Sequence, residues 1–249
     1  VTYQHCRVVF GLTASPFLLA ATLRHHFSQI DSPIARELDR SFYVDNLATS
    51  IDETHQLNQF MTEADTILRT GGFELRQWQH TRLPETERHP TPALERMECC
   101  TSESFSVLGL QWDKVLDTLY FEAPTPRPQQ DITKRFMLSI VMTIFDPIGF
   151  TAPYTIQAKI LIQRAWGLKA DWDKPLPMAI AENFRRWYHT LPSLTKCHIP
   201  RYLFQSQWSP STTSIHAFSD GSQDAYAACI FIRTQVQDHV QVTLVTAKA

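Results

Sequence analysis

Residues 42–46 constrain the fold of this chain more than any other segment, because they place a carboxylate on a tight turn. A run of aromatic and aliphatic side chains favours extended backbone, and Asp45-Asn46 suits a hairpin tip. Residues 47–50 are expected to return as a second short strand. The pattern predicts a β-hairpin that exposes Asp45, where a hard divalent cation can reach it. The alternative is an ordinary turn residue.

Composition narrows the class of protein. With 249 residues, 43% of them apolar, the chain is long enough for one large or two to three small domains with packed cores. The five cysteines show no Cys-x-x-Cys spacing, which favours a reducing, intracellular environment without a structural metal. We find no apolar run long enough to span a bilayer and no signal-peptide pattern, so no membrane partner is expected. A starting methionine is missing, so we expect a piece of a longer chain.

Charge is distributed unevenly along the chain, although the net charge is only −2. Residues 31–122 carry 17 acidic and 8 basic side chains, a net −9, whereas residues 123–249 carry 13 basic and 8 acidic ones, a net +5. A basic C-terminal half beside an acidic metal centre would fit a phosphate backbone. An ordinary solvated surface is the alternative explanation.

Apolar periodicity predicts two helices in the first third. One begins at Ser15-Pro16 and is expected to end at Asp31-Ser32-Pro33. The other begins after Asp52 and ends at Gly71-Gly72, where glycine supplies a left-handed cap. Residues 73–78 alternate between apolar and polar side chains and predict a strand. The apolar stripe of the second helix consists of Leu57, Phe60, Met61, Ala64, Ile67 and Leu68.

The remaining sequence predicts a polar loop, a hairpin, three helices and three strands. Residues 79–103 are polar and rich in proline, so a mobile loop is expected there. Pro124, Pro126 and Pro128 form a stiff linker and mark a domain boundary. The predicted hairpin spans residues 105–112 and 118–121, the helices span 132–145 and begin near 151 and 177, and the strands span 215–218, 225–232 and 240–245.

Four stretches, in this order, resemble the Pol polyprotein of Bel/Pao-type LTR retrotransposons. Residues 10–17 resemble a palm motif of the reverse transcriptase, and Tyr43-Val44-Asp45-Asn46 resembles its catalytic hairpin. Residues 133–163, with the block Phe145-Asp146-Pro147-Ile148-Gly149-Phe150, are similar to the segment that follows the palm. Residues 217–228 resemble the first hairpin of the RNase H domain. The four matches together identify the chain as a member of this family.

The resemblance implies an α+β fold with three parts. These are a partial reverse transcriptase palm at residues 1–123, a helical thumb or connection segment at 124–200, and the first strands of an RNase H-like α/β domain at 201–249. The parent would be an RNA-directed DNA polymerase with RNase H. It would use Mg²⁺ or Mn²⁺, an RNA template, an RNA–DNA duplex and the remainder of the polyprotein. That the fragment by itself binds no metal is the alternative.

The resemblance also implies the catalytic residues. Asp45 and Asp220 would be catalytic carboxylates, and Asp45, Asn46 and Asp220 would face the metal ions. Asn46 stands where the Tyr-x-Asp-Asp hairpin has its second aspartate. The upstream palm aspartate is expected before Val1 and the next RNase H acid beyond Ala249, with Asp224 a turn residue. We therefore expect the fragment alone to be inactive.

Basic side chains on the expected helices after the linker could bind nucleic acid. Lys134, Arg135, Lys159 and Arg164 are assigned to this role, with Lys169 nearby, and simple solvation of a helix face is the alternative. We expect Trp166, Trp172 and Trp187 to be core residues rather than platforms for stacked bases.

Three other functions stay open at this point. The chain could be a non-catalytic nucleic-acid-binding module, or an inactive product of a decayed gene that folds only marginally. A retrotransposon aspartic peptidase is a further alternative, and it needs an Asp-Ser/Thr-Gly loop. The nearest sequences, Asp31-Ser32-Pro33 and Asp220-Gly221-Ser222, do not match that loop.

Overall fold

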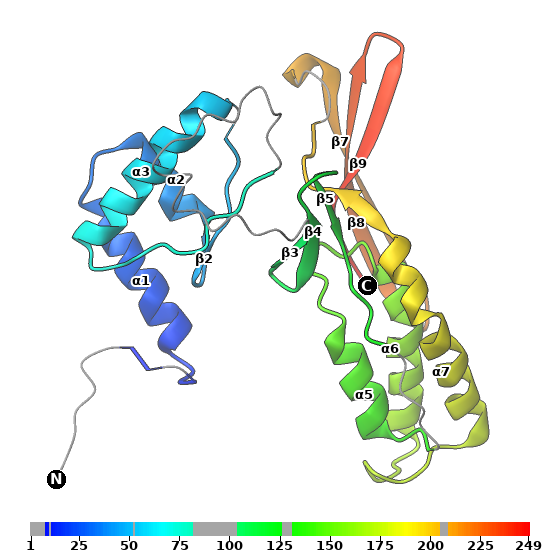
Figure 1. Cartoon of the computed structure of the whole chain (residues 1–249). Coiled ribbons are helices and arrows are strands. Elements are labelled where there is room, and N and C mark those ends of the chain that lie inside the picture. Colours follow the sequence, from blue (N-terminus) through cyan, green and yellow to red (C-terminus); the bar gives the residue numbers. More distant parts are fainter. Residues whose placement is uncertain (1–7, 10, 52, 82–103, 126–130, 205–208) are drawn as a thin grey trace, which may run out of the picture. The chain divides into compact units, whose positions relative to one another are not determined.

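A computed structural model describes residues 8–9, 11–51, 53–81, 104–125, 131–204 and 209–249 (Figure 1). The chain divides into two compact units, Val1–Thr101 and Ser102–Ala249. The described part combines six α-helices with three small antiparallel sheets, so the predicted α+β class is confirmed. The division into three domains stays a prediction. Within the ranges above, no helix combines the length and the apolarity needed to cross a bilayer.

In the first unit, the described residues form three helices and one very short hairpin. Apolar side chains of all three helices form its core, in which Leu38 and Ala64 are fully buried. The nitrogen Nε2 of His26 on the first helix lies 2.7 Å from the carbonyl oxygen of Ile67 on the third, so a partly buried polar contact joins them. The elements are α1 (Ser15–Ser28), α2 (Pro33–Ser41), β1 (Phe42–Tyr43), β2 (Asn46–Leu47) and α3 (Thr54–Thr70).

Helix α2 was missed by the sequence analysis. Asp31-Ser32-Pro33 was interpreted only as the end of the preceding helix, which ends at Ser28. The same residues begin a new helix, because the hydroxyl of Ser32 accepts a hydrogen bond from the backbone N–H of Ile34 at 3.1 Å. Pro33 fits the first helical turn, where no N–H partner is needed.

The predicted stripe of α3 is confirmed, whereas the strand predicted after it is wrong. Phe60, Met61, Ala64, Ile67 and Leu68 are buried, and Leu57, the other predicted member, is half-buried. Gly72 has φ of +79° and supplies the expected left-handed residue. Residues 73–78 form no strand, because their alternating apolar side chains pack against the helices of this unit without a neighbouring strand. The loop predicted at 79–103 lies outside the described residues except for 79–81. Asp52, after which the helix was predicted to begin, also lies outside them.

The second unit contains a four-stranded antiparallel sheet in the order β3-β4-β5-β6. The single strand predicted for residues 105–112 is instead two strands, because Leu108 and Gly109 both have positive φ and close a tight turn. The predicted hairpin across residues 113–117 is confirmed. The strands are β3 (Ser104–Val107), β4 (Leu110–Asp113), β5 (Thr118–Tyr120) and β6 (His198–Pro200).

A polar cluster of Asp117, Arg201 and Trp112 links the β4–β5 turn to the segment after β6. Asp117 accepts two hydrogen bonds from the guanidinium of Arg201, at 2.6 and 3.0 Å, and a third from the indole Nε1 of Trp112 at 2.9 Å. The guanidinium carbon of Arg201 also lies 5.5 Å from the centre of the Trp112 ring. This cluster therefore links residues that are 84 positions apart in sequence.

Three helices form the principal core of the second unit, and their prediction is confirmed. They are α5 (Lys134–Thr143), α6 (Ala152–Gly167) and α7 (Met178–Thr190). Phe184 and Met137 are fully buried between them. Helices α6 and α7 are joined by reciprocal bonds, since the Tyr154 hydroxyl donates to the Trp187 carbonyl at 2.5 Å and the Trp187 indole donates to the Tyr154 carbonyl at 3.0 Å. Burial raises the pKa of Tyr154, which keeps this hydroxyl protonated.

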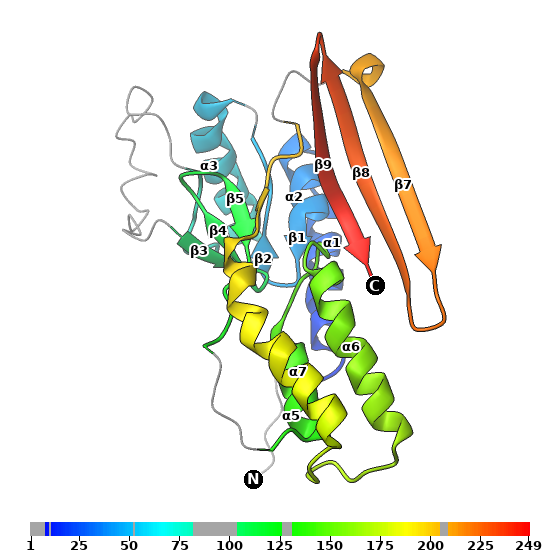
Figure 2. The same cartoon turned by 90° about the vertical axis from the view of Figure 1, so that its right-hand side faces the viewer.

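The last three strands form an antiparallel sheet with β8 in the centre (Figure 2). The predicted strands are confirmed and are longer than expected: β7 (Thr213–Gly221), β8 (Tyr226–Val236) and β9 (His239–Lys248). Several apolar side chains of this sheet are exposed, among them Ile215 at 73% and Phe218 at 58%.

Candidate nucleic-acid interface

Asp45 lies on a two-residue hairpin turn between β1 and β2. Tyr43 pairs with Asn46, so the turn consists of Val44 and Asp45, and Asn46 already belongs to the second strand. The second strand is shorter than predicted and ends at Leu47. Val44 has φ of +58°, which is strained for a β-branched residue. Both Asp45 and Asn46 are exposed, as the sequence predicted for Asp45.

The donor set at this hairpin is too small for two divalent cations. The amide of Asn46 donates a hydrogen bond to the carboxylate of Asp45 at 3.1 Å, so one negative charge and one neutral amide are presented. Two-metal sites need several carboxylates to balance four positive charges. In the described part of the chain, no group of three or more His, Cys, Asp or Glu side chains could hold a metal ion. The hairpin alone therefore does not supply the ligands of a two-metal site.

Asp220 lies near the end of β7, in the other unit. Its side chain is exposed, and one carboxylate oxygen accepts a hydrogen bond from the neighbouring N–H of Gly221 at 2.8 Å. Asp224 lies in the turn that follows, as expected. One carboxylate is again too few for a two-cation site. The structure leaves the predicted roles of Asp45, Asn46 and Asp220 as predictions.

Two of the four predicted nucleic-acid-binding residues lie at the beginning of α5. Lys134 is only 8% exposed, so little of its side chain can meet a ligand. Arg135 is exposed but donates two hydrogen bonds to Asp173, at 2.7 and 3.0 Å, and its guanidinium carbon lies 6.0 Å from the Trp172 ring centre. The hydrogen bond from Arg135 lowers the pKa of Asp173, which favours the ionised pair.

The other two predicted residues lie on α6. The ammonium of Lys159 donates to the carbonyl oxygen of Ala249 at 2.6 Å. Nη2 of Arg164 lies 3.7 Å from the Asp224 carboxylate, and both side chains are more than half exposed. Arg164 thus remains accessible although a carboxylate lies beside it.

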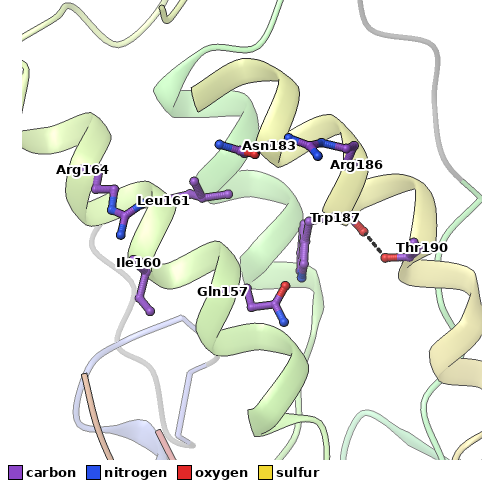
Figure 3. A pocket seen from close by; sticks show the side chains of 8 residues that line it. All are labelled: Gln157, Ile160, Leu161, Arg164, Asn183, Arg186, Trp187 and Thr190. Atoms are coloured by element: carbon purple, nitrogen blue, oxygen red, sulfur yellow. Dashed lines mark hydrogen bonds between the residues drawn. The ribbon is translucent and has the colours of Figure 1, made fainter. Parts of the chain in front are cut away.

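Helices α6 and α7 border an open groove of about 540 Å³ (Figure 3). Arg186 on α7 lines this groove together with Arg164 on α6. No signal in the sequence singles out Arg186 as a binding residue, although its spacing from Asn183 and Thr190 places all three on one helix face. Trp187 forms part of the groove and is buried, as predicted, whereas the predicted core residues Trp166 and Trp172 are about half exposed. The groove is lined by Gln157, Ile160, Leu161, Arg164, Asn183, Arg186, Trp187 and Thr190.

The block Phe145-Asp146-Pro147-Ile148-Gly149-Phe150 positions the beginning of α6. The Asp146 carboxylate accepts hydrogen bonds from the N–H of Gly149 at 2.7 Å and from the N–H and hydroxyl of Thr151, both at 2.6 Å. The backbone of this loop also bonds to β9, since the N–H of Ala247 donates to the carbonyl of Ile148 at 2.7 Å. The block therefore connects the helices to the last sheet.

Comparison with known proteins gives one family. Residues 133–249 match the family model described as Pao retrotransposon-like RNaseH-like domain. This match supports an RNase H region for that part of the chain, and more particularly one of the Pao/Bel retrotransposon type. The description names no peptidase. Searches of curated proteins and of solved structures gave no match.

Proposed function

We propose that this chain is a segment of a Bel/Pao-type retrotransposon Pol polyprotein. It would run from part of a reverse transcriptase palm, through a helical connection, into the first strands of an RNase H-like domain. The observation that carries the proposal is the family match across residues 133–249. The strained hairpin that exposes Asp45 adds support for the palm, because strain at an exposed turn is common at functional sites.

In this proposal the segment by itself does not polymerise DNA or cleave RNA. The parent would be an RNA-directed DNA polymerase with RNase H, dependent on Mg²⁺ or Mn²⁺. Asp45 with Asn46 supplies a single negative charge, and Asp220 supplies another in the other unit. Neither hairpin alone balances the charge of two cations.

Primer extension on an RNA template, with Mg²⁺ or Mn²⁺, tests this part of the proposal. No incorporation of nucleotides is expected from the chain, and no cleavage of RNA in an RNA–DNA duplex. Incorporation that disappears in Asp45→Ala, or cleavage that disappears in Asp220→Ala, would refute the proposed inactivity. Asp238→Ala is the matched control, because it removes an exposed carboxylate from the turn between β8 and β9, away from both hairpins.

A second candidate is a non-catalytic module that binds an RNA–DNA duplex. The accessible guanidinium of Arg164, in a half of the chain with net charge +5, favours it. Binding is then expected to weaken with salt, with a slope that reports the number of neutralised phosphates. An affinity that does not change between low and physiological salt would exclude this candidate.

A further inference from the structure

The groove between α6 and α7 is built from matching faces of the two helices. Gln157, Ile160, Leu161 and Arg164 lie three, four and seven positions apart on α6, which makes one continuous stripe. The residues of α7 that line the groove have the same spacing. The reciprocal bonds between Tyr154 and Trp187 hold the helices together beside these stripes. The groove is therefore a preformed feature of a packed helix pair.

The chemistry of the lining favours an anion. The eight lining residues include two arginines, two amides and a hydroxyl, and none of the eight is acidic. Nη2 of Arg186 donates to the amide oxygen of Asn183 at 2.6 Å, and this bond orients the guanidinium without neutralising its charge. Ile160, Leu161 and Trp187 provide apolar surface between the polar groups (Figure 3). A phosphate ester that carries an organic group would match both parts of this lining.

Asp224 does not line the groove, but its carboxylate contacts Arg164, which does. It lies 3.7 Å from Arg164, a long distance for an ion pair, and both side chains are largely solvated. Such a pair contributes little to stability and is readily exchanged. The hydroxyl of Ser222 accepts hydrogen bonds from the N–H groups of Asp224 and Ala225, at 3.3 and 3.2 Å, so the turn that presents Asp224 is ordered.

We propose that the α6–α7 groove binds backbone phosphates of a nucleic-acid strand through Arg164 and Arg186, and that Asp224 competes with a phosphate for Arg164. The inference rests on the proposed nucleic-acid-binding function and adds a site and a competing group to it. A phosphate can take two parallel hydrogen bonds from one guanidinium, whereas Asp224 makes one long contact. Binding of the strand would therefore release Asp224 from Arg164.

Fluorescence anisotropy of a labelled RNA–DNA duplex, with the full chain at low salt, tests the proposal. Arg164→Gln and Arg186→Gln are each expected to weaken binding roughly tenfold and to reduce the salt slope by about one. Asp224→Asn is expected to strengthen binding roughly two- to fivefold. In the double variant Arg164→Gln/Asp224→Asn that gain is expected to vanish, because the carboxylate acts through Arg164.

Arg233→Gln is the matched control, since it removes the same charge from β8, outside the groove. If wild-type protein binds the duplex and the groove variants behave like Arg233→Gln, the groove is refuted while the binding function stands. If wild-type protein does not bind the duplex at all, the groove proposal and the nucleic-acid-binding function on which it rests both fail. If inorganic phosphate or AMP displaces the duplex when its concentration equals that of the duplex, the groove is a site for small phosphates. That result would refute a nucleic-acid strand as the ligand of the groove.

Discussion

Replacement of Asp146 by alanine is expected to destabilise the second unit more than any change at an exposed acid. The substitution removes the acceptor of three hydrogen bonds, of 2.6 to 2.7 Å, from Gly149 and Thr151. Thr151 is only 2% exposed and Gly149 is buried, so water reaches these donors poorly. A buried polar group without a partner costs about 1–3 kcal/mol.

We therefore expect Asp146→Ala to lower the free energy of unfolding by about 2–4 kcal/mol, and Asp146→Asn by about 1–2 kcal/mol. Asparagine keeps one acceptor oxygen, but its NH₂ group would face a donor. Urea unfolding followed by circular dichroism measures the total effect. Amide hydrogen exchange at Gly149 and Thr151 measures the local effect, which matters because the chain has two units.

Asp171→Ala is the control for this experiment. Asp171 makes an exposed ion pair with Lys174 at 2.7 Å, and its loss is expected to cost less than about 0.5 kcal/mol. If Asp146→Ala is no more destabilising than this control, and exchange at Gly149 and Thr151 is unchanged, the role of Asp146 in holding the loop before α6 is wrong.

Three further predictions concern backbone strain and pH. Val44→Gly is expected to raise the melting temperature of the first unit, because glycine removes a strained φ that costs about 1–3 kcal/mol; no gain relative to Val44→Ala would contradict this. Gly149→Ala is expected to destabilise by more than 1 kcal/mol, since φ is +90° and a Cβ atom would overlap the carbonyl oxygen of Ala247; unchanged urea unfolding would disprove the close approach. Hydrogen bonds from Ser41 and Thr49 lower the pKa of Glu37, so its contribution to stability is present above pH of about 4.3 and is lost as the pH falls through the lowered value. The stability difference between wild type and Glu37→Gln should then shrink on acidification, and a difference that grows would show the opposite shift.

The helices of the second unit and the last three strands were predictable because their signals are local. The start of α6 after Thr151 and of α7 after Pro177 follows from proline and apolar spacing alone. Helix α2 was missed because a Ser-Pro pair can either end one helix or begin the next, and only neighbouring packing decides between them. The strand predicted for residues 73–78 failed because alternation shows which side chains are buried but supplies no partner strand.

The candidate site was only partly predictable. The exposure of Asp45 and of Arg164 follows from a turn and a helix face, both of which are local features. The burial of Lys134 and the contact of Arg164 with Asp224 depend on how distant segments pack, and no spacing in the sequence reports that. Arg186 was overlooked because its role appears only when a second helix is placed beside it.

The bond between Ile148 and Ala247 has a consequence for the order of events during synthesis. Its two residues are separated by about 100 positions. The ribosome therefore synthesises the loop that precedes α6 much earlier than β9, the strand that contacts this loop. Contacts between such distant positions form late, because a long loop must close first. The three helices can thus collapse early around Phe184, whereas the loop at Gly149 gains its final conformation only when β9 arrives. A ribosome that pauses before β9 would therefore hold a nascent chain with formed helices and an open loop at its junction with the sheet.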